Sequence, residues 1–574
     1  MCGISGIINH KDAGSLILKM TDAQAHRGPD AKGIYANEVD ALGHNRLSII
    51  DLSESGNQPL YSADKRYVII FNGEVYNYTE LKIKLKEHYH FVTQTDTEVV
   101  LAAWLIWGSK CLNEFIGMFA FAIWDTQEKK LFAARDRFGV KPFHYSIVNN
   151  TFLFASEIKA IHATGLLSRE ANEEIWATYF CNGLYDFNQQ TFWNNIYKLP
   201  AGHQLIWENN KLIISNWYNI TDRLKADTRK QEEIEVELLY LLEDAVRLRF
   251  RADVPVGVCL SGGLDSSLLL ALIQKVKGKD FPIHAFTFYT GDEKYDELPW
   301  VQQMIKDSAV IHHACKLTVD EIPRLAKKIS HHMDEPYGGI PTLGMSKVFE
   351  KSAELGVKVL LDGNGMDEGW GGYDYYQKAN TVDFTRGPVQ GSSKVLSIEN
   401  CLTDWFKNKT IKPPKAQYHS DPVINLQLRD LLMSKIPRSM RFADRNSMAY
   451  SIELREPFLD HRIIELGLNQ PLENKIRNGK GKYLVRKIAQ QLIPTQVGEA
   501  PKRAVQTPQR EWLANELSNW AKTLINSAES NDWFKPNSLQ TEFDAYQKEM
   551  PDNSFYIWQM INAALSLNRA EQIS

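Results

Sequence analysis

The fold of the second half of this chain is decided by one stretch, Pro255-Val256-Gly257-Val258-Cys259-Leu260-Ser261-Gly262-Gly263-Leu264-Asp265-Ser266-Ser267. Its first six residues are apolar and predict a buried strand. A Gly-rich turn follows and leads into the apolar segment 268–276, which predicts a helix. A strand, a Gly-rich turn and a helix start present backbone N–H groups and the positive end of a helix dipole to an anion. The stretch therefore predicts a phosphate-binding loop.

The segments around this loop predict an α/β domain. Further apolar runs at 283–288, 310–317 and 357–361 are separated by helical segments, as in a parallel sheet that is covered on both faces. From about Asp421 to the end the sequence is mostly helical and shows no internal repeat. We therefore expect a parallel-sheet domain with a helical C-terminal part.

The first part of the chain, up to about Trp217, has a different character. Short apolar runs predict strands at 3–8, 67–71, 119–124, 130–134 and 152–155, and helical segments lie at 79–86 and 97–108. Turn signals at Asn72-Gly73 and after Asp125 favour antiparallel hairpins, so we expect an α+β domain with antiparallel sheets between helices. The charged segment 221–235 is interpreted as a linker. The predicted domains are 1–217 and 218–574.

The composition is that of an ordinary globular protein, with 44% hydrophobic and 24% charged residues among 574. The net charge of -4 implies no general attraction to nucleic acid or to an anionic membrane. No apolar stretch reaches the length of a membrane span and no secretory start precedes Cys2, so we expect a cytoplasmic protein. The six cysteines lack the spacing of a zinc site or of a disulfide framework.

The phosphate-binding loop has a specific residue pattern. It lacks the Walker sequence, and its string is S-G-G-x-D-S, in which the serines add hydroxyl donors. Asp265 would repel a bare phosphate and is best explained as a ligand of a Mg²⁺ ion that bridges the phosphates. The string resembles the PP-loop of ATP pyrophosphatases. This resemblance implies that ATP is cleaved to AMP and pyrophosphate, with a carboxylate or carbonyl oxygen of the substrate becoming adenylated.

The second residue, Cys2, is a candidate nucleophile. If Met1 is removed, Cys2 carries a thiol and a free α-amine that titrates near pH ~8, so one residue holds both the nucleophile and a proton acceptor. Strings at 26–30, 43–49, 71–74, 95–98 and 135–142 look like the glutaminase domain of class II amidotransferases, which has the N-terminal-nucleophile hydrolase fold. With the PP-loop and the strings at 362–368, 455–462 and 480–487, the whole chain resembles the glutamine-hydrolysing asparagine synthetase family.

The resemblance implies roles for residues of the first domain. Arg46 binds the carboxylate of glutamine, and Glu74 and Asp96 receive its α-ammonium group. The amide of Asn72 and the backbone N–H of Gly73 form the oxyanion hole. Because ammonia is overwhelmingly protonated in neutral water, the family requires a dry passage to the second site. The partners implied are glutamine and a carboxylate acceptor, and the resemblance allows a homodimer.

In the second domain the resemblance implies a site for ATP and Mg²⁺. The residues assigned to ATP are Val258, Cys259, Leu260, Ser261, Gly262, Gly263, Leu264, Asp265, Ser266, Ser267, Phe288, Asp362 and Gly363. Within this set, residues 258–260 back the adenine. Asp265 and Asp367 hold the metal with pyrophosphate, and Lys482 neutralises charge on the α-phosphate. The catalytic assignments are thus Cys2, Asn72, Gly73, Asp362 and Lys482.

The chain departs from the family at Asn364, where well-understood members carry a glutamate that handles protons during attack by ammonia. Asparagine cannot accept a proton at neutral pH. Asp362, two residues earlier, is the nearest acid in the sequence. We therefore expect Asp362 or the phosphate of the substrate to take the proton.

The acceptor has two interpretations. Aspartate is the acceptor implied by the family as a whole. Strings at 334–342 and 369–376, however, are similar to asparagine-synthetase-like proteins of bacterial surface polysaccharide, which amidate a uronic-acid sugar. The aromatic run within 370–376 either stacks on a sugar ring or packs in the core.

A third interpretation is a non-catalytic synthetase-like binding protein, for which Asn364 is the evidence. The intact Cys2, Arg46, Asp96, PP-loop, Asp367 and Lys482 oppose it. Cys2 itself also disfavours the β-lactam synthetase type, which has lost its nucleophile.

Overall fold

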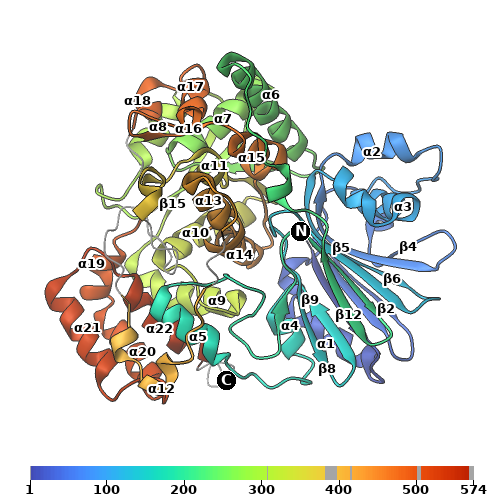
Figure 1. Cartoon of the computed structure of the whole chain (residues 1–574), viewed down its shortest axis with the longest axis horizontal. Coiled ribbons are helices and arrows are strands. Elements are labelled where there is room, and N and C mark those ends of the chain that lie inside the picture. Colours follow the sequence, from blue (N-terminus) through green and yellow to red (C-terminus); the bar gives the residue numbers. More distant parts are fainter. Residues whose placement is uncertain (1, 307, 382–396, 414–416, 501–505, 568–574) are drawn as a thin grey trace.

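The computed structural model describes residues 2–306, 308–381, 397–413, 417–500 and 506–567. The antiparallel sheets of the first part lie on the right of Figure 1, and the helix-rich second part lies on the left.

Two antiparallel six-stranded sheets form the centre of the first part. Their strand orders are β10-β8-β9-β1-β3-β2 and β12-β11-β7-β6-β5-β4. The strands are β1 (Gly3–Ile8), β2 (Ala31–Ala36), β3 (Ala41–Arg46), β4 (Leu60–Tyr61), β5 (Tyr67–Val75), β6 (Gly117–Asp125), β7 (Lys130–Arg135), β8 (His144–Val148), β9 (Thr151–Ala155), β10 (Tyr197–Lys198), β11 (His203–Glu208) and β12 (Lys211–Asn216). Apolar side chains of both sheets, such as Ile4, Ile70 and Phe154, pack together in one buried cluster.

Helices cover the outer faces of these two sheets. Helices α1 (Ala13–Ala23) and α4 (Ile158–His162) pack on the first sheet, and α2 (Tyr78–Leu85) and α3 (Asp96–Trp107) pack beside β5. The predicted α+β layout with antiparallel sheets between helices is confirmed.

The pair Asn72-Gly73 does not form a hairpin turn, so that part of the prediction was wrong. Both residues lie inside β5, where they pair with Ala120 and Phe119 of β6. A Cβ atom on Gly73 would lie 2.1 Å from the carbonyl oxygen of Met118, and the φ of Gly73 is +150°. The glycine is therefore needed for the close approach of β6 and for its own backbone conformation.

A five-stranded parallel sheet forms the centre of the second part, with the order β15-β14-β13-β16-β17. Its strands are β13 (Val256–Cys259), β14 (His284–Tyr289), β15 (Ile311–Lys316), β16 (Val359–Leu361) and β17 (Glu453–Arg455). Helices α6 (Gln231–Arg249) and α7 (Leu264–Lys277) pack on one face, and α10 (Ile340–Glu354) packs on the other.

The four predicted strands of this sheet are confirmed, but β17 was missed because it lies in the region expected to be mostly helical. Two of its three residues, Glu453 and Arg455, are charged, and both are fully buried in an ion pair of 2.6 Å. Charged residues hide a buried strand from any hydrophobicity pattern.

The C-terminal region is helical, as expected, and it shares its core with a helix from the first part of the chain. Helix α5 (Glu173–Asn182) packs in one apolar cluster with α9 (Ile322–Met333), α20 (Ser518–Glu529) and α22 (Phe555–Leu567). The Nδ2 of Asn562 in α22 lies 2.8 Å from the hydroxyl of Tyr179 in α5. The α5 segment thus joins the two parts, as Figure 1 also shows.

Helix α14 (Ile436–Met448) connects the parallel-sheet domain to the N-terminal strand. The guanidinium of Arg27 donates to both carboxylate oxygens of Asp444 at 2.8 and 3.0 Å, and its Nε donates to the carbonyl oxygen of Cys2 at 3.0 Å. Burial opposes ionisation of Asp444, but Arg27 lowers its pKa below the usual value. The backbone at Cys2 is therefore held through one arginine by a helix of the other domain.

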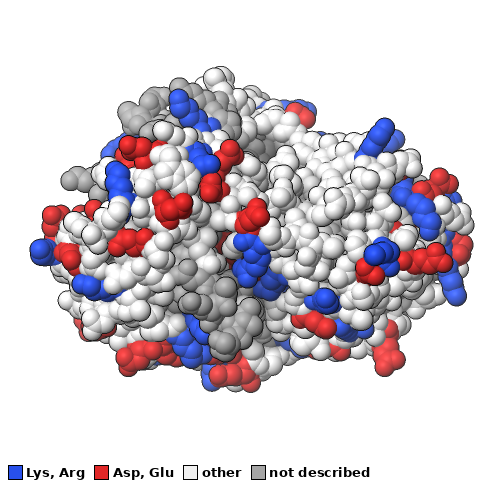
Figure 2. All heavy atoms as spheres, turned by 90° about the horizontal axis from the view of Figure 1, so that it is seen from below, with Lys and Arg blue, Asp and Glu red and all other residues white. Residues whose placement is uncertain are grey.

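No helix in the described ranges is long and apolar enough to cross a lipid bilayer. On the face shown in Figure 2, basic and acidic side chains are interspersed.

Candidate active sites

Four of the five residues predicted to bind glutamine line one small cavity together with Cys2, and the fifth, Asn72, is not among its lining residues. Its lining includes Cys2, Arg46, Gly73, Glu74 and Asp96. Cys2 precedes β1, Arg46 ends β3, Gly73 and Glu74 lie in β5, and Asp96 begins α3. Residues as much as 94 positions apart in sequence therefore line one cavity.

Cys2 and Asn72 contact each other in this region. The backbone N–H of Cys2 donates to Oδ1 of Asn72 at 2.9 Å, and burial raises the pKa of the Cys2 thiol. The Nδ2 of Asn72 is buried and has no hydrogen-bond partner among the residues that the structure describes. An unused amide donor beside a thiol is what an oxyanion hole requires.

We expect the Asn72→Ala variant to lose about 10²- to 10³-fold in the rate of glutamine hydrolysis, because one preorganised donor to the oxyanion is removed. Synthesis from free ammonia should not change. The measurement is the kcat for glutamate release, with ammonia-dependent synthesis as the control. A kcat within twofold of the wild type would contradict the assignment.

The charges beside Cys2 are suited to an ammonium group. Burial raises the pKa of Asp96 to about 7, and burial together with Glu453 and Asp96 raises the pKa of Glu74 well above its usual value. The guanidinium of Arg455 lies 3.3 Å from Oε1 of Glu74. Glu74 and Glu453 thus contact one guanidinium, whose charge also acts on Asp96, and the positive α-ammonium group of an amino acid would further favour ionisation of these carboxyl groups.

Arg46 is positioned at the same cavity by oxygen acceptors. It donates to the carbonyl oxygen of Ser53 at 2.7 Å and to Oδ1 of Asn57 at 2.9 Å. A Cβ atom on Gly56 would lie 2.2 Å from Nη2 of Arg46, so a larger residue would displace the guanidinium. The arginine is held rigidly where the carboxylate of glutamine is expected.

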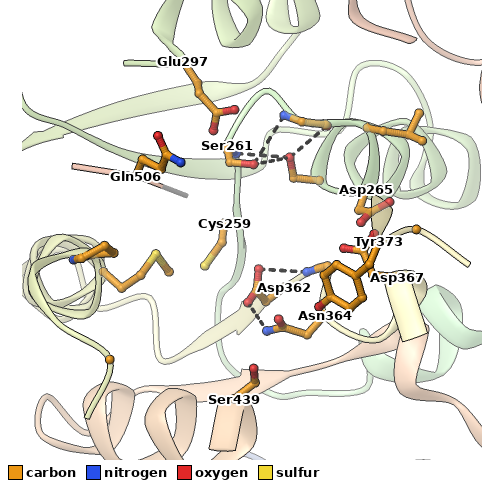
Figure 3. Close-up of a pocket in the computed structure, with 18 of the residues that line it drawn as sticks. Cys259, Ser261, Asp265, Glu297, Asp362, Asn364, Asp367, Tyr373, Ser439 and Gln506 are labelled. Carbon is orange, nitrogen blue, oxygen red and sulfur yellow. Dashed lines mark hydrogen bonds between the residues drawn. The ribbon is translucent and has the colours of Figure 1, made fainter. Parts of the chain in front are cut away.

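A second and larger cavity, of about 810 Å³, lies at the carboxyl ends of the parallel strands (Figure 3). Of the residues predicted for ATP, metal and catalysis in this domain, those that line it are Cys259, Leu260, Ser261, Gly262, Gly263, Leu264, Asp265, Ser266, Phe288, Asp362, Gly363, Asp367 and Lys482. Val258 and Ser267 do not line it. Val258 is fully buried in the apolar core that β13 shares with α6 and α7, and Ser267 is fully buried in α7.

The loop between β13 and α7 is held in shape by its serines. The hydroxyl groups of Ser261 and Ser266 lie 3.0 Å apart, and Ser266 also accepts from the backbone N–H of Ser261 at 3.2 Å. Gly262 has a φ of +74°, a conformation that favours glycine. Because α7 begins at Leu264, its first N–H groups face the cavity that the loop encloses, as an anion-binding loop requires.

Lys482 lies between the two carboxylates assigned to the metal. Its Nζ is 2.5 Å from Oδ2 of Asp265 and 2.6 Å from Oδ1 of Asp367. Burial opposes the charge, but the two carboxylates raise the pKa of Lys482. A Cβ atom on Gly372 would lie 1.8 Å from Asp367 and 2.3 Å from Lys482, so glycine makes room for this arrangement.

These side chains also fit a Mg²⁺ ion. Asp265 and Asp367 converge on one positive charge, which shows that both can reach a single cation. The described part of the chain contains no group of three or more acidic, histidine or cysteine side chains that could hold a metal by themselves. Two carboxylates with phosphate and water oxygens are the ligands that Mg²⁺ takes in nucleotide sites.

Asn364 lines the same cavity and is held by carboxylates. Its Nδ2 donates to Oδ2 of Asp362 at 2.7 Å and contacts Oε1 of Glu456 at 3.3 Å. The other oxygen of Asp362 accepts from the N–H of Gly363 at 2.9 Å. Burial raises the pKa of Asp362 above its usual value.

The aromatic run within 370–376 mostly packs in the core. Trp370 is fully buried, and Tyr375 and Tyr376 both donate to Oδ2 of Asp430. Tyr373 does line the cavity, and its hydroxyl donates to Glu368 at 2.7 Å. One ring of the run is therefore available to a substrate.

The sequence predicted no role for several charged residues that the structure buries. Arg27, Lys141, Arg455 and Glu456 are all buried. Each lies within a string that carried the family resemblance, but nothing in the sequence shows what each one faces. The signal in the sequence that could have pointed to burial is a charged residue directly beside an apolar one, as Arg455 and Glu456 follow Leu454.

Comparison with known proteins agrees with this geometry. Residues 1–218 match the family model of the glutamine amidotransferase domain, and residues 237–569 match that of asparagine synthase. Glutamine-hydrolysing asparagine synthetase 1 of Bacillus subtilis is 29% identical, with 98% of this chain and 95% of the relative covered. Asparagine synthetase 3 of the same organism is 29% identical, with 92% of this chain and 91% of the relative covered. Amidase chry2 of Gibberella zeae is 26% identical, with 92% of both chains covered.

The asparagine synthase model covers more than half of the chain, and the first domain has the antiparallel architecture expected of an N-terminal-nucleophile hydrolase. The chain therefore belongs to the glutamine-hydrolysing asparagine synthetase family, as a glutamine-dependent amidotransferase domain joined to an asparagine synthase domain.

Proposed function

We propose that this chain hydrolyses glutamine at Cys2, passes the ammonia inside the protein, and amidates an adenylated carboxylate with the conversion of ATP to AMP and pyrophosphate. We propose aspartate as the acceptor and asparagine as the product. The observation that carries this proposal is the position of β17 between the two cavities. Arg455 contacts Glu74 of the first cavity, and the preceding residue, Leu454, lines the second.

In the glutamine site, each residue has a chemical task. Once Met1 has been removed, the α-amine of Cys2 accepts the thiol proton and the thiolate attacks the amide carbon of glutamine. Asn72 Nδ2 and the N–H of Gly73 stabilise the oxyanion, while Arg46 binds the carboxylate of the substrate. A glutamyl thioester forms, ammonia leaves, and water then releases glutamate.

This proposal predicts a pH dependence of glutamine use. Since burial raises the pKa of Asp96 to about 7, this carboxyl is neutral below that pH and cannot pair with the α-ammonium group. We expect the ratio of the kcat/KM of the wild type to that of an Asp96→Asn variant to rise about tenfold per pH unit below 7 and to level off above it, because the α-amine of Cys2 titrates in both enzymes and its effect cancels in the ratio. Steady-state glutaminase kinetics between pH 5.5 and 8.5 measure this.

The matched variant for the pH experiment is Asp96→Asn, which cannot ionise. Its kcat/KM should be low at every pH and should lack the part of the rise that Asp96 causes. A ratio that does not change with pH would assign the titration to another group.

In the synthetase site, we propose that the loop from Ser261 to Ser266 binds the phosphates of ATP and that Asp265 and Asp367 hold Mg²⁺. The metal, when bound, supplies positive charge to the pyrophosphate leaving group. Lys482 lies beside both carboxylates and provides a fixed positive charge for the α-phosphate. The acceptor carboxylate attacks the α-phosphorus, and pyrophosphate leaves.

The acceptor is tested by a screen for pyrophosphate release. Glutamine, ATP and Mg²⁺ are supplied with aspartate, with homologous amino acids or with nucleotide-linked uronic acids. Turnover with aspartate supports the proposal, and turnover only with a uronic acid replaces aspartate by a sugar acceptor, for which Tyr373 in the cavity wall is the supporting observation. A chain that shows neither glutaminase activity nor pyrophosphate release would be a non-catalytic relative.

A further inference from the structure

Attack by ammonia on an adenylated carboxylate leaves an extra proton on nitrogen, and this proton must be removed before the amide is complete. Asn364, which lines the cavity, cannot take it because an amide is not a base at neutral pH. The structure places two carboxyl groups against this asparagine, one on its own segment and one directly after β17.

The amide of Asn364 bridges these two carboxyl groups. Its Nδ2 is 2.7 Å from Oδ2 of Asp362 and 3.3 Å from Oε1 of Glu456, which follows β17. Ionised carboxylates only accept hydrogen bonds, so the NH₂ side of the amide must face both of them. Figure 3 shows Asp362 and Asn364 facing each other in the cavity wall.

The two carboxyl groups differ in the oxygen that is left to accept a proton. Each oxygen of Asp362 already accepts a hydrogen bond, one from the N–H of Gly363 and the other from the amide of Asn364. Glu456 is 4% exposed, and its Oε2 has no hydrogen-bond partner among the residues described. A buried acceptor without a partner requires an explanation, and a transient proton donor is one.

Residues on the two sides of Glu456 contact the two cavities. The residue before it, Arg455, is 3.3 Å from Glu74 in the glutamine cavity, and Asn364 on its other side lines the ATP cavity. Glu456 itself lines neither cavity, but if ammonia moves from Cys2 towards ATP along this chain of contacts, it passes Glu456 before it reaches the adenylate.

The surroundings of Glu456 are suited to proton transfer near neutral pH. Burial and the carboxylate of Asp362 raise its pKa well above the usual value, whereas the hydrogen bond from Asn364 and the charge of Lys141 act in the opposite direction. An acid whose pKa is raised towards the working pH is an efficient general base.

We propose that Glu456 is the proton acceptor for ammonia in the amide-forming step and that Asn364 positions its carboxylate. The lone pair of ammonia forms the C–N bond, one N–H proton moves to Oε2 of Glu456, and the C–O bond to phosphate breaks with AMP taking the electron pair. Glu456 then releases its proton to solvent. This inference rests on the proposed function, and it assigns to Glu456 the task expected from sequence for Asp362.

The test is the Glu456→Gln variant, which keeps size and polarity but removes the base. We expect amide synthesis from free ammonia to fall about 10²- to 10⁴-fold, while acceptor-dependent exchange of pyrophosphate into ATP stays within about twofold of the wild type. Plotted against the concentration of unprotonated ammonia, the wild-type rate should rise with pH through the raised pKa of Glu456 and level off. The variant should lack this rise.

Control variants separate a chemical from a structural role. Glu465→Gln makes the same change at a carboxyl that lines neither cavity and accepts from Tyr218 at 2.9 Å, so it should have no effect on synthesis. Glu456→Asp keeps a carboxylate, so it should retain the pH rise at a lower rate, and it serves as the test if Glu456→Gln does not fold.

Three results would overturn the inference. In the first, Glu456→Gln synthesises the amide at the wild-type rate. In the second, both Glu456 variants lose pyrophosphate exchange and amide synthesis to the same extent. In the third, amide synthesis is lost selectively in Asp362→Asn alone. A wild-type chain with no acceptor-dependent pyrophosphate release would instead reject the proposed function, so the two failures are distinguishable.

Discussion

The Cys2→Ala variant is expected to lose glutamine-dependent amide synthesis by about 10⁴- to 10⁶-fold, because none of the other described residues that line the first cavity carries a thiol to form the thioester. Synthesis from free ammonia should continue at the wild-type rate, since the second cavity is built from other residues. The measurement is product formation with each nitrogen donor at saturating ATP and acceptor.

A matched control is Cys111→Ala. Cys111 is fully buried in the core of the same domain and lines neither cavity, so its loss should affect stability but not the choice of nitrogen donor. Mass spectrometry of the purified chain should show that Met1 is absent. Retention of Met1 in an active enzyme, or glutamine-dependent synthesis by Cys2→Ala, would refute the assignment of the nucleophile.

The Lys482→Met variant is expected to lose about 10²- to 10³-fold in acceptor-dependent pyrophosphate release. Asp265 and Asp367 lie 2.5 and 2.6 Å from Nζ of Lys482, and the substitution removes the positive charge that they share. It also removes the positive charge that is proposed to stabilise the α-phosphate of ATP. Basal glutamine hydrolysis should be retained because Lys482 lies in the other domain. Paired assays of pyrophosphate and glutamate release measure both reactions on the same sample.

The control for this variant is Lys487→Met in α17 (Tyr483–Ala489), the helix that Lys482 directly precedes as the N-cap residue. Lys487 pairs with Glu235 at the surface, and exposed ion pairs contribute about 0–1 kcal/mol, so pyrophosphate release should not change. Equal losses in the two variants would show that Lys482 acts through the stability of α17 and not through the phosphates.

Much of the fold could be predicted from the sequence because its signals are local. The apolar runs of β1 and β7 coincide with the predicted strands to within one residue, and all four predicted parallel strands occur in the sheet. Hydrophobic periodicity reports burial when the buried side chains are apolar. Hydrophobic periodicity failed at β17, where Glu453 and Arg455 neutralise each other in the interior. The turn signal failed at Asn72-Gly73, where a turn-like dipeptide lies inside a strand.

The sequence by itself predicted the two kinds of site, because a cysteine at position 2 and the string from Ser261 to Ser267 each need particular residue types at short spacing. Only the tertiary structure decided how the two sites are connected. Arg27 meets Asp444 and Arg455 meets Glu74 across hundreds of residues, and Glu456 meets Asn364 across 92 residues. The physical reason is that a buried charge is stable only beside its partner, and the partner is chosen by packing between domains, which no local pattern records.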